Sequence, residues 1–304
     1  MSRTLILGGG IIGLSIAFEL SSRGDEVSVI ENGDFGRQAS WAGAGMLPPT
    51  NAQTAIHPLE HLAALSNERH FEWSTRLKLL TGIDNDYRIN GSLHLAQTAG
   101  EIASLFGAVD EWDTQQIEFE RLAYDELLKR FKFLGGTLAA AKSKSVLTPT
   151  AAQFDNRRHL DALVAACRLQ AVSLEDQTKV LKFDINEQEQ ARGNRRRVSA
   201  VHTVGLNESV HREPVDHVVI AAGPWSESLA IQFDQSLPMQ PVRGQMVGYR
   251  VCAEEHQDLV NGPIINEGTR YLVARSNGYI VAGSTIEETG FDCETTEEEI
   301  AELR

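Results

Sequence analysis

The fold is decided by the stretch T-L-I-L-G-G-G-I-I-G, residues 4–13. Its first four residues form a short apolar run, which is typical of a strand buried on both faces of a sheet. Three glycines follow, after which apolar residues recur every four positions, at Ile12, Ile16 and Leu20. This spacing predicts a helix over 11–23. The stretch therefore predicts a strand, a glycine turn and a helix in immediate succession.

A second strand and an acidic residue complete this βαβ unit. The apolar run 27–30 ends at Glu31, and the turn has the spacing Gly8-x-Gly10-x-x-Gly13. In a dinucleotide-binding turn the first glycine allows the bend, the second admits the pyrophosphate, and the third lets helix and strand pack closely. The free N–H groups at the helix N-terminus attract phosphate, and the acid accepts hydrogen bonds from a ribose hydroxyl. The unit predicts FAD or NAD rather than NADP, and leaves FAD and NAD open.

Composition narrows the class of protein. The chain has 304 residues, of which 42% are apolar and 23% charged, as in globular proteins. A formal net charge of −14 argues against binding to nucleic acid or to an anionic membrane. The cysteines Cys167, Cys252 and Cys293 lie far apart without a C-x-x-C pair, which favours a reducing compartment. We therefore expect a cytoplasmic protein with no membrane span, and no metal site, because His57 and His61 lack a third ligand.

Further elements follow from periodicity and apolar runs. We expect helices over 58–80, 101–112, 124–133 and 159–172, and strands within 87–97, 179–183, 201–204, 216–221, 242–251, 270–275 and 279–282. The basic run Arg195–Arg197 is expected in a solvated hairpin. The mixture predicts an α/β fold of mixed α+β character, with a Rossmann-like dinucleotide-binding domain and a second, mainly antiparallel-sheet domain.

The loop after Glu31 distinguishes FAD from NAD. The stretch G-R-Q-A-S-W-A-G-A-G-M-L (36–47), together with the glycine turn, resembles the glycine-oxidase branch of the D-amino-acid oxidase family of FAD enzymes. Three further stretches agree in family order: A-A-G-P-W-S (221–226), P-V-R-G-Q-M (241–246) and Y-L-V-A-R-S-N-G-Y-I-V-A-G-S-T-I-E-E-T-G-F-D (271–292). The resemblance implies the two-domain fold of that family, with FAD as the cofactor.

The resemblance also assigns residues to the cofactor. They are Gly8, Gly10, Ile11, Ile12, Gly13, Glu31, Asn32, Ala39, Ser40, Ala44, Gly45, Met46, Val180 and Gly223. Ala39 and Ser40 would contact the phosphates, Ala44–Met46 would line the isoalloxazine ring, and Val180 would bracket the adenine. Trp41 is expected to pack outward. The surroundings of Cys293 do not match a covalent flavin link, so the FAD is expected to be non-covalent.

Substrate and reaction are likewise implied by the resemblance. Tyr271, Arg275 and Ile286 match substrate-pocket positions, although Arg275 could equally form a surface or structural ion pair. A small amino acid or amine, such as glycine, would lose a hydride to flavin N5, giving an imine, and molecular oxygen would become hydrogen peroxide. The imine would serve the thiazole of thiamine. No separate catalytic side chain is expected, and the family's frequent tetramers suggest a homo-oligomer.

The resemblance also has a gap. The later family motifs W-x-G-x-R-P and G-H-x-x-x-G have no counterpart, and the last ten residues resemble the opening of a helix. We therefore expect an FAD-binding domain over 1–50 and 143–225, and a substrate domain over 51–142 and 226–304 that is C-terminally incomplete. Two alternatives stay open: a catalytically impaired flavin-fold protein or partner subunit, and an NAD-dependent dehydrogenase.

Overall fold

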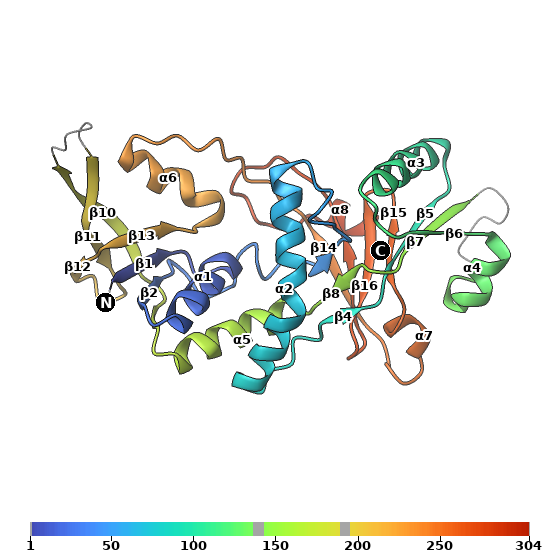
Figure 1. Ribbon diagram of the computed structural model, residues 1–304, viewed down its shortest axis with the longest axis horizontal. Helices are drawn as coiled ribbons and strands as arrows, with labels where there is room; N and C mark the ends of the chain where they lie inside the picture. The colour runs from blue at the N-terminus through green and yellow to red at the C-terminus, as the bar shows by residue number, and fades with distance from the viewer. Residues whose placement is uncertain (1, 136–142, 189–194, 304) are drawn as a thin grey trace. The chain divides into compact units, whose positions relative to one another are not determined.

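The computed structural model describes residues 2–135, 143–188 and 195–303 (Figure 1). Its contacts divide the chain into two compact units, each made of segments that are distant in sequence. The first unit comprises Met1–Gly43, Leu77–Ile83 and Asn156–Pro241, and the second comprises Ala44–Arg76, Asp84–Asp155 and Val242–Arg304. Among the described residues, no helix is long and apolar enough to cross a membrane.

The first unit is built on a parallel sheet in the order β13-β1-β2-β9. Its strands are β1 (Arg3–Leu7), β2 (Glu26–Ile30), β9 (Ser173–Glu175) and β13 (His217–Ile220). Helix α1 (Ile11–Ser22) joins β1 to β2 and packs against α5 (Asn156–Leu169). Leu14, Ala17 and Phe18 are fully buried on the inner face of α1. The predicted βαβ unit is therefore present, with each boundary within two residues of its expected position.

A three-stranded antiparallel sheet covers part of this core. It consists of β10 (Lys179–Gln188), β11 (Arg195–Val204) and β12 (Val210–Pro214). Phe183 and Val201 of this sheet pack with Leu5, Leu7 and Ile30 of the parallel sheet. The run Arg195–Arg197, expected in a hairpin, begins β11 and pairs with Asn186–Gln188 of the antiparallel neighbour β10.

The last elements of the first unit follow β13. They are a 3-10 turn η3 (Gly223–Trp225), helix α6 (Ser226–Ala230) and a second 3-10 turn η4 (Ile231–Phe233). The contacts therefore place residues 226–241 in the first unit, whereas the sequence placed them in the second. The reason is that Leu229 and Phe233 pack onto the core formed by the two sheets.

The second unit contains a seven-stranded sheet in the order β14-β17-β16-β15-β5-β7-β6. Its strands, in sequence order, are β5 (Ser92–Ala96), β6 (Glu120–Leu122), β7 (Lys144–Thr148), β14 (Met246–Arg250), β15 (Ile264–Glu267), β16 (Arg270–Ala274) and β17 (Tyr279–Gly283). Every pairing is antiparallel except that between β15 and β5. The mainly antiparallel second domain is thereby confirmed.

Helices and a small sheet complete this unit. The helices are α2 (Pro58–Thr81, whose last turn belongs to the first unit), α3 (Ala99–Thr114), α4 (Tyr124–Arg130), η1 (Lys132–Leu134), α7 (Gln257–Val260) and α8 (Glu297–Glu302). The small sheet has the order β3-β8-β4, with β3 (Met46–Leu47), β8 (Ala152–Gln153) and β4 (Arg88–Ile89).

The unit boundary before α5 differs from the sequence-based expectation. Residues 144–155 belong to the second unit, because β7 pairs with β5 and β6 while β8 pairs with β3 and β4. Residues 44–50, expected in the first unit, likewise belong to the second unit, because β3 pairs with β8. The assignment of cofactor and substrate roles to the two units remains a prediction.

Candidate active site

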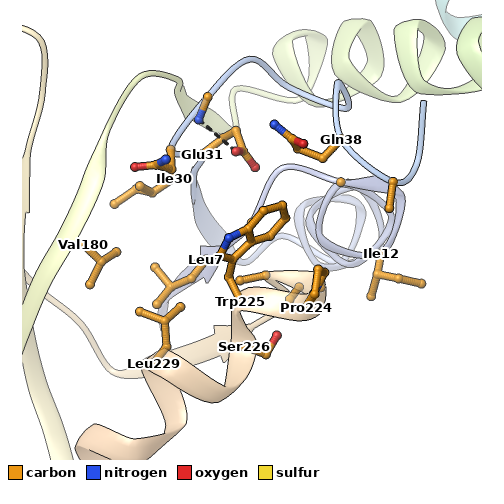
Figure 2. A pocket seen from close by; sticks show the side chains of 18 of the residues that line it. Leu7, Ile12, Ile30, Glu31, Gln38, Val180, Pro224, Trp225, Ser226 and Leu229 are labelled. Atoms are coloured by element: carbon orange, nitrogen blue, oxygen red, sulfur yellow. Dashed lines mark hydrogen bonds between the residues drawn. The ribbon is translucent and has the colours of Figure 1, made fainter. Parts of the chain in front are cut away.

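A pocket of about 480 Å³ lies in the first unit, at the carboxyl ends of its parallel strands. Leu7 ends β1, Ile30 ends β2, and Ala221 follows β13, and all three line the pocket. Ligands of open parallel sheets bind at this edge. The predicted cofactor residues that line it are Gly8, Gly10, Ile11, Ile12, Glu31, Asn32, Ala39, Ser40, Val180 and Gly223. Figure 2 labels Ile12, Glu31 and Val180 among them.

The glycine turn is required by close packing as well as by a ligand. Gly8 has φ +111°, and a Cβ on it would lie 2.4 Å from the carbonyl oxygen of Ala221. A Cβ on Gly13 would lie 1.9 Å from the carbonyl oxygen of Gly8. Gly13 therefore does not line the pocket but lets α1 pack against the turn. Gly10 faces the pocket, and a Cβ there would come within 3.0 Å of Ser40 Oγ.

The N-terminus of α1 opens on the pocket. Its N-cap residue, Gly10, has no side chain to bond the first amides of the helix. The Ile11 N–H donates to Ser40 Oγ at 3.0 Å. A hydroxyl that accepts one hydrogen bond keeps its own proton for donation. Ser40 can therefore donate to a phosphate oxygen while it holds the helix end, and the helix end itself favours an anion.

Glu31 joins the glycine turn to the segment that follows β2. Its Oε2 accepts from the Gly9 N–H at 2.7 Å and its Oε1 accepts from the Gly33 N–H at 2.9 Å. Each carboxylate oxygen has a second lone pair, so both can accept a further hydrogen bond from a ribose hydroxyl. Glu31 therefore fixes the glycine turn even without a ligand.

Other pocket residues were not singled out from the sequence. They are Gln38, Thr178, Lys179, Trp225, Ser228, Leu229 and Met239, together with strand-end and turn residues. Trp225 is 43% exposed and projects from the η3 turn into the pocket (Figure 2). The motif A-A-G-P-W-S pointed to this segment, but only Gly223 was chosen, because sequence does not show which way a side chain leaves a 3-10 turn.

The loop after Phe35 is fastened to α5. Asn156 Nδ2 donates to the carbonyl oxygens of Ser40 at 2.7 Å and of Trp41 at 3.0 Å. The guanidinium carbon of Arg157 lies 3.5 Å from the centre of a Trp41 ring. Trp41 stays outside the pocket and packs on Arg157. A cation over an indole face is a favourable contact, so Trp41 anchors this part of the loop.

The remaining predicted cofactor residues lie in the second unit. Ala44 is buried in a cluster with Ile264 and Val273, against which Met46, Met246 and Tyr271 also pack. Of the predicted substrate residues, Tyr271 therefore lies near Ala44 and Met46, and burial raises the pKa of its hydroxyl. Ile286 is 73% exposed and does not belong to this cluster.

Arg275 lies in the interior of the second unit. It is 2% exposed, its Nη1 donates to Gln153 Oε1 at 2.8 Å, and its Nη2 donates to the carbonyl oxygen of Ala44. The prediction left a substrate contact and a surface or structural ion pair open. A position on the surface is excluded by this burial, and the guanidinium contacts the segment predicted to line the flavin.

Arg243 belongs to a separate polar network of the second unit. It donates to Glu287 Oε2 at 2.6 Å and to Asp292 Oδ2 at 3.0 Å. Thr285 and Gln245 also donate to Glu287. The hydrogen bond from Arg243, followed by those from Thr285 and Gln245, lowers the pKa of Glu287 to about 2. The network ties the segment just before β14 to the segment that follows β17.

This network predicts a loss of stability in acid. The pKa of Glu287 falls from 4.5 to about 2 on folding, so its contribution is complete above pH 4.5 and is lost as the pH falls toward 2. We expect Glu287→Gln to lower the melting temperature at pH 6 and to differ little from the unmodified protein near pH 2. Melting curves of both proteins between pH 2 and pH 6 test this prediction. A difference that grows as the pH falls would contradict the assignment.

The fold and the pocket define a dinucleotide-binding protein of the Rossmann-like class, with a second, antiparallel-sheet domain. Residues 3–304 match the family model DAO, FAD dependent oxidoreductase, and the chain belongs to this family. The predicted enzyme class and the FAD cofactor are thereby confirmed, and the match favours FAD over the NAD-dependent alternative.

Similar proteins agree with this assignment. A glycine oxidase of Pseudomonas putida is 29% identical over 304 residues, which cover 99% of this chain and 76% of the relative. The bifunctional protein ThiO/ThiG of Synechocystis is 30% identical over 305 residues, covering 99% of this chain and 41% of the relative. The crystal structure of glycine oxidase from Geobacillus kaustophilus superposes with a TM-score of 0.81 at 27% identity, covering 100% of this chain and 76% of the other.

The residues present fit the dinucleotide half of FAD. Gly8 and Gly10 line the pocket without side chains, which leaves the backbone of the turn open where a pyrophosphate binds. Glu31 offers carboxylate oxygens for the ribose, and Val180 and Trp225 supply apolar surface for a flat ring. FAD, when bound, supplies a two-electron acceptor, and these residues would hold its nucleotide end.

The indole of Trp225 gives a prediction for this pocket. We expect Trp225→Ala to weaken FAD binding about tenfold and Trp225→Phe to weaken it much less, since a buried aromatic face contributes roughly 1 kcal/mol beyond its area. Quenching of the remaining tryptophan fluorescence by FAD measures both constants. Trp112→Phe, in α3 of the second unit, is the control. An unchanged dissociation constant in Trp225→Ala would remove Trp225 from the binding surface.

Proposed function

We propose that this protein is an FAD-dependent oxidase of glycine or another small amine or amino acid. The net reaction converts the amine and molecular oxygen into the imine and hydrogen peroxide. The observation that carries the proposal is the dinucleotide pocket of the first unit, in a chain matched by the FAD dependent oxidoreductase family over residues 3–304. The similarity to glycine oxidases over 99% of the chain supports the choice of substrate.

The pocket residues have distinct roles in this proposal. Gly8, Gly10 and the N-terminus of α1 bind the pyrophosphate, with Ser40 donating to a phosphate oxygen. Glu31 accepts from the ribose, and Val180 borders the adenine. The FAD is held non-covalently by these contacts. The segment 44–46 lines the ring that accepts the hydride, and small residues let its backbone approach that ring.

The cellular role is the further part of the proposal. Relatives named ThiO/ThiG unite an oxidase-like portion with a second activity in one chain. We assign this protein the supply of glycine imine for the thiazole of thiamine. The three described cysteines are all free thiols, which agrees with action in the cytoplasm.

A peroxide assay tests the oxidase proposal. The purified chain is saturated with FAD and given glycine, sarcosine or D-alanine, and hydrogen peroxide is measured with a peroxidase-coupled dye. We expect peroxide formation that depends on both FAD and amine. Bound FAD with no peroxide from any of the three amines would instead support a flavin-fold partner subunit.

A further inference from the structure

We infer that Arg275 is a positioning residue that sets the backbone of the segment Ala44–Met46, and that it is not the ligand of the substrate carboxylate. The inference rests on the proposed function, because it takes this segment as the one that lines the flavin ring. It starts from three features of the second unit: the burial of Arg275, its hydrogen bond to Ala44, and the close packing around Gly45.

The guanidinium is committed to protein atoms. Nη1 donates to Gln153 Oε1 and Nη2 donates to the Ala44 carbonyl oxygen, and both partners are themselves buried, with exposures of 0% and 8%. A substrate carboxylate could reach this guanidinium only by displacing these partners. Leaving a buried carbonyl unpaired carries a desolvation cost, so such a displacement is unfavourable.

The same hydrogen bond fixes the direction of one peptide. Because the peptide unit is planar and trans, a donor held on the Ala44 carbonyl makes the Gly45 N–H point to the opposite side. Among the residues that the structure describes, that N–H has no hydrogen-bond partner. Arg275 therefore presents one free backbone donor on the face of the segment turned away from it.

The surroundings of Gly45 leave no room for a side chain. Gly45 has φ +65°, and a Cβ on it would lie 2.1 Å from the Phe154 carbonyl oxygen and 3.2 Å from Arg275 Nη2. Its own carbonyl accepts from the Phe154 N–H at 3.0 Å, and Met46 pairs with Gln153 in the β3–β8 ladder. Consecutive residues of the segment are thus held by Arg275, by Phe154 and by the β3–β8 pairing.

The backbone of Arg275 is in turn fixed by the end of the β16–β17 hairpin. Its N–H donates to the Tyr279 carbonyl at 2.8 Å, and its carbonyl accepts from the Gly278 N–H at 3.0 Å. The preceding residue, Ala274, accepts from Arg88 Nη2 at 2.8 Å. Arg275 therefore transmits the position of a rigid hairpin end to the segment 44–46.

Hydrogen–deuterium exchange of the FAD-free protein tests this without relying on oxidase activity. We expect Arg275→Gln to speed exchange of the Phe154 amide, which donates to the Gly45 carbonyl, and of the β3 residues 46–47 about tenfold or more, as for loss of a hydrogen bond to a charged group. Arg270→Gln, at the exposed start of β16, the strand that Arg275 follows, is the control and should leave these amides unchanged. Gln153→Leu keeps the arginine but removes one partner, and should produce a smaller effect in the same peptides.

Two readouts on the FAD-loaded protein separate positioning from substrate binding. For positioning, Arg275→Lys lowers kcat and shifts the visible flavin absorption while KM for glycine stays within about twofold. A tenfold rise in KM, with an unchanged spectrum and unchanged exchange at 46–47, would overturn the inference and restore Arg275 as the carboxylate ligand. If glycine is not oxidised at all, the proposed function fails, while the exchange and spectral results still decide the role of Arg275.

Discussion

Gly13→Ala is expected to weaken FAD binding more than any other single glycine-to-alanine substitution in this chain. The new Cβ would lie 1.9 Å from the Gly8 carbonyl oxygen. The turn is also confined at Gly8, where a Cβ would lie 2.4 Å from the Ala221 carbonyl oxygen. The helix must therefore move away from β1, which opens the turn that holds the pyrophosphate. Overpacking of this kind costs roughly 1–3 kcal/mol of stability.

A fluorescence titration measures the effect of Gly13→Ala. The dissociation constant for FAD should rise by about two powers of ten, since the pyrophosphate contacts and the helix terminus are displaced together. Gly107→Ala is a matched control, because that glycine lies within α3 with open space around it. Its affinity for FAD should equal that of the unmodified protein. An unchanged affinity in Gly13→Ala would show that the turn tolerates the shift.

Removal of the Glu31 carboxylate is expected to have the second largest effect. Glu31→Ala loses the acceptors of both the Gly9 and Gly33 amides as well as the predicted ribose contact. Hydrogen bonds to a charged group contribute about 1.5–3 kcal/mol each, so FAD affinity should fall by one to two powers of ten, and the FAD-free protein should also melt earlier. Isothermal calorimetry and thermal melting measure the two effects.

A conservative variant separates charge from shape at this position. In Glu31→Gln the amide oxygen can accept one of the two backbone bonds, but the amide nitrogen cannot accept the other. The FAD affinity and the melting temperature of Glu31→Gln should therefore lie between those of Glu31→Ala and those of the unmodified protein. Glu26→Gln is the control: Glu26 lies at the exposed start of β2, the strand that precedes Glu31. This variant should change neither FAD affinity nor the melting temperature. If Glu31→Ala lowered FAD affinity without lowering the melting temperature, the proposed bracing of the turn would be wrong.

The sequence predicts the nucleotide half of the site because its information is local. The turn, the helix start and the acid after β2 lie within 31 consecutive residues, and their spacing predicts that Gly8, Gly10 and Glu31 surround one pocket. Ser40 is assigned to the same pocket by the family resemblance. The side-chain direction of Trp225 is not local in this sense. It depends on how the η3 turn packs, and no periodicity reveals it.

Pairings between distant strands account for most of what the sequence does not predict. The parallel pair of β15 and β5 joins residues more than 160 positions apart, and β8 pairs with β3 and β4 rather than extending the first unit. The position of Arg275 likewise depends on contacts with residues that are distant in sequence. A charged side chain after a strand is expected at the surface, but the buried guanidinium of Arg275 donates to the Ala44 carbonyl oxygen and to the Gln153 side-chain oxygen, and both residues are remote from it in sequence.

The central claim is that the pocket of the first unit binds FAD, and a titration of the FAD-free chain with FAD tests it most directly. Glycine is then added without oxygen, and the visible flavin spectrum is recorded throughout. The account predicts saturable binding with a perturbed flavin band, lost in Gly13→Ala, and bleaching of that band by glycine. A spectrum identical to that of free FAD at every protein concentration, in a chain that melts cooperatively, would contradict the claim that the pocket of the first unit binds FAD.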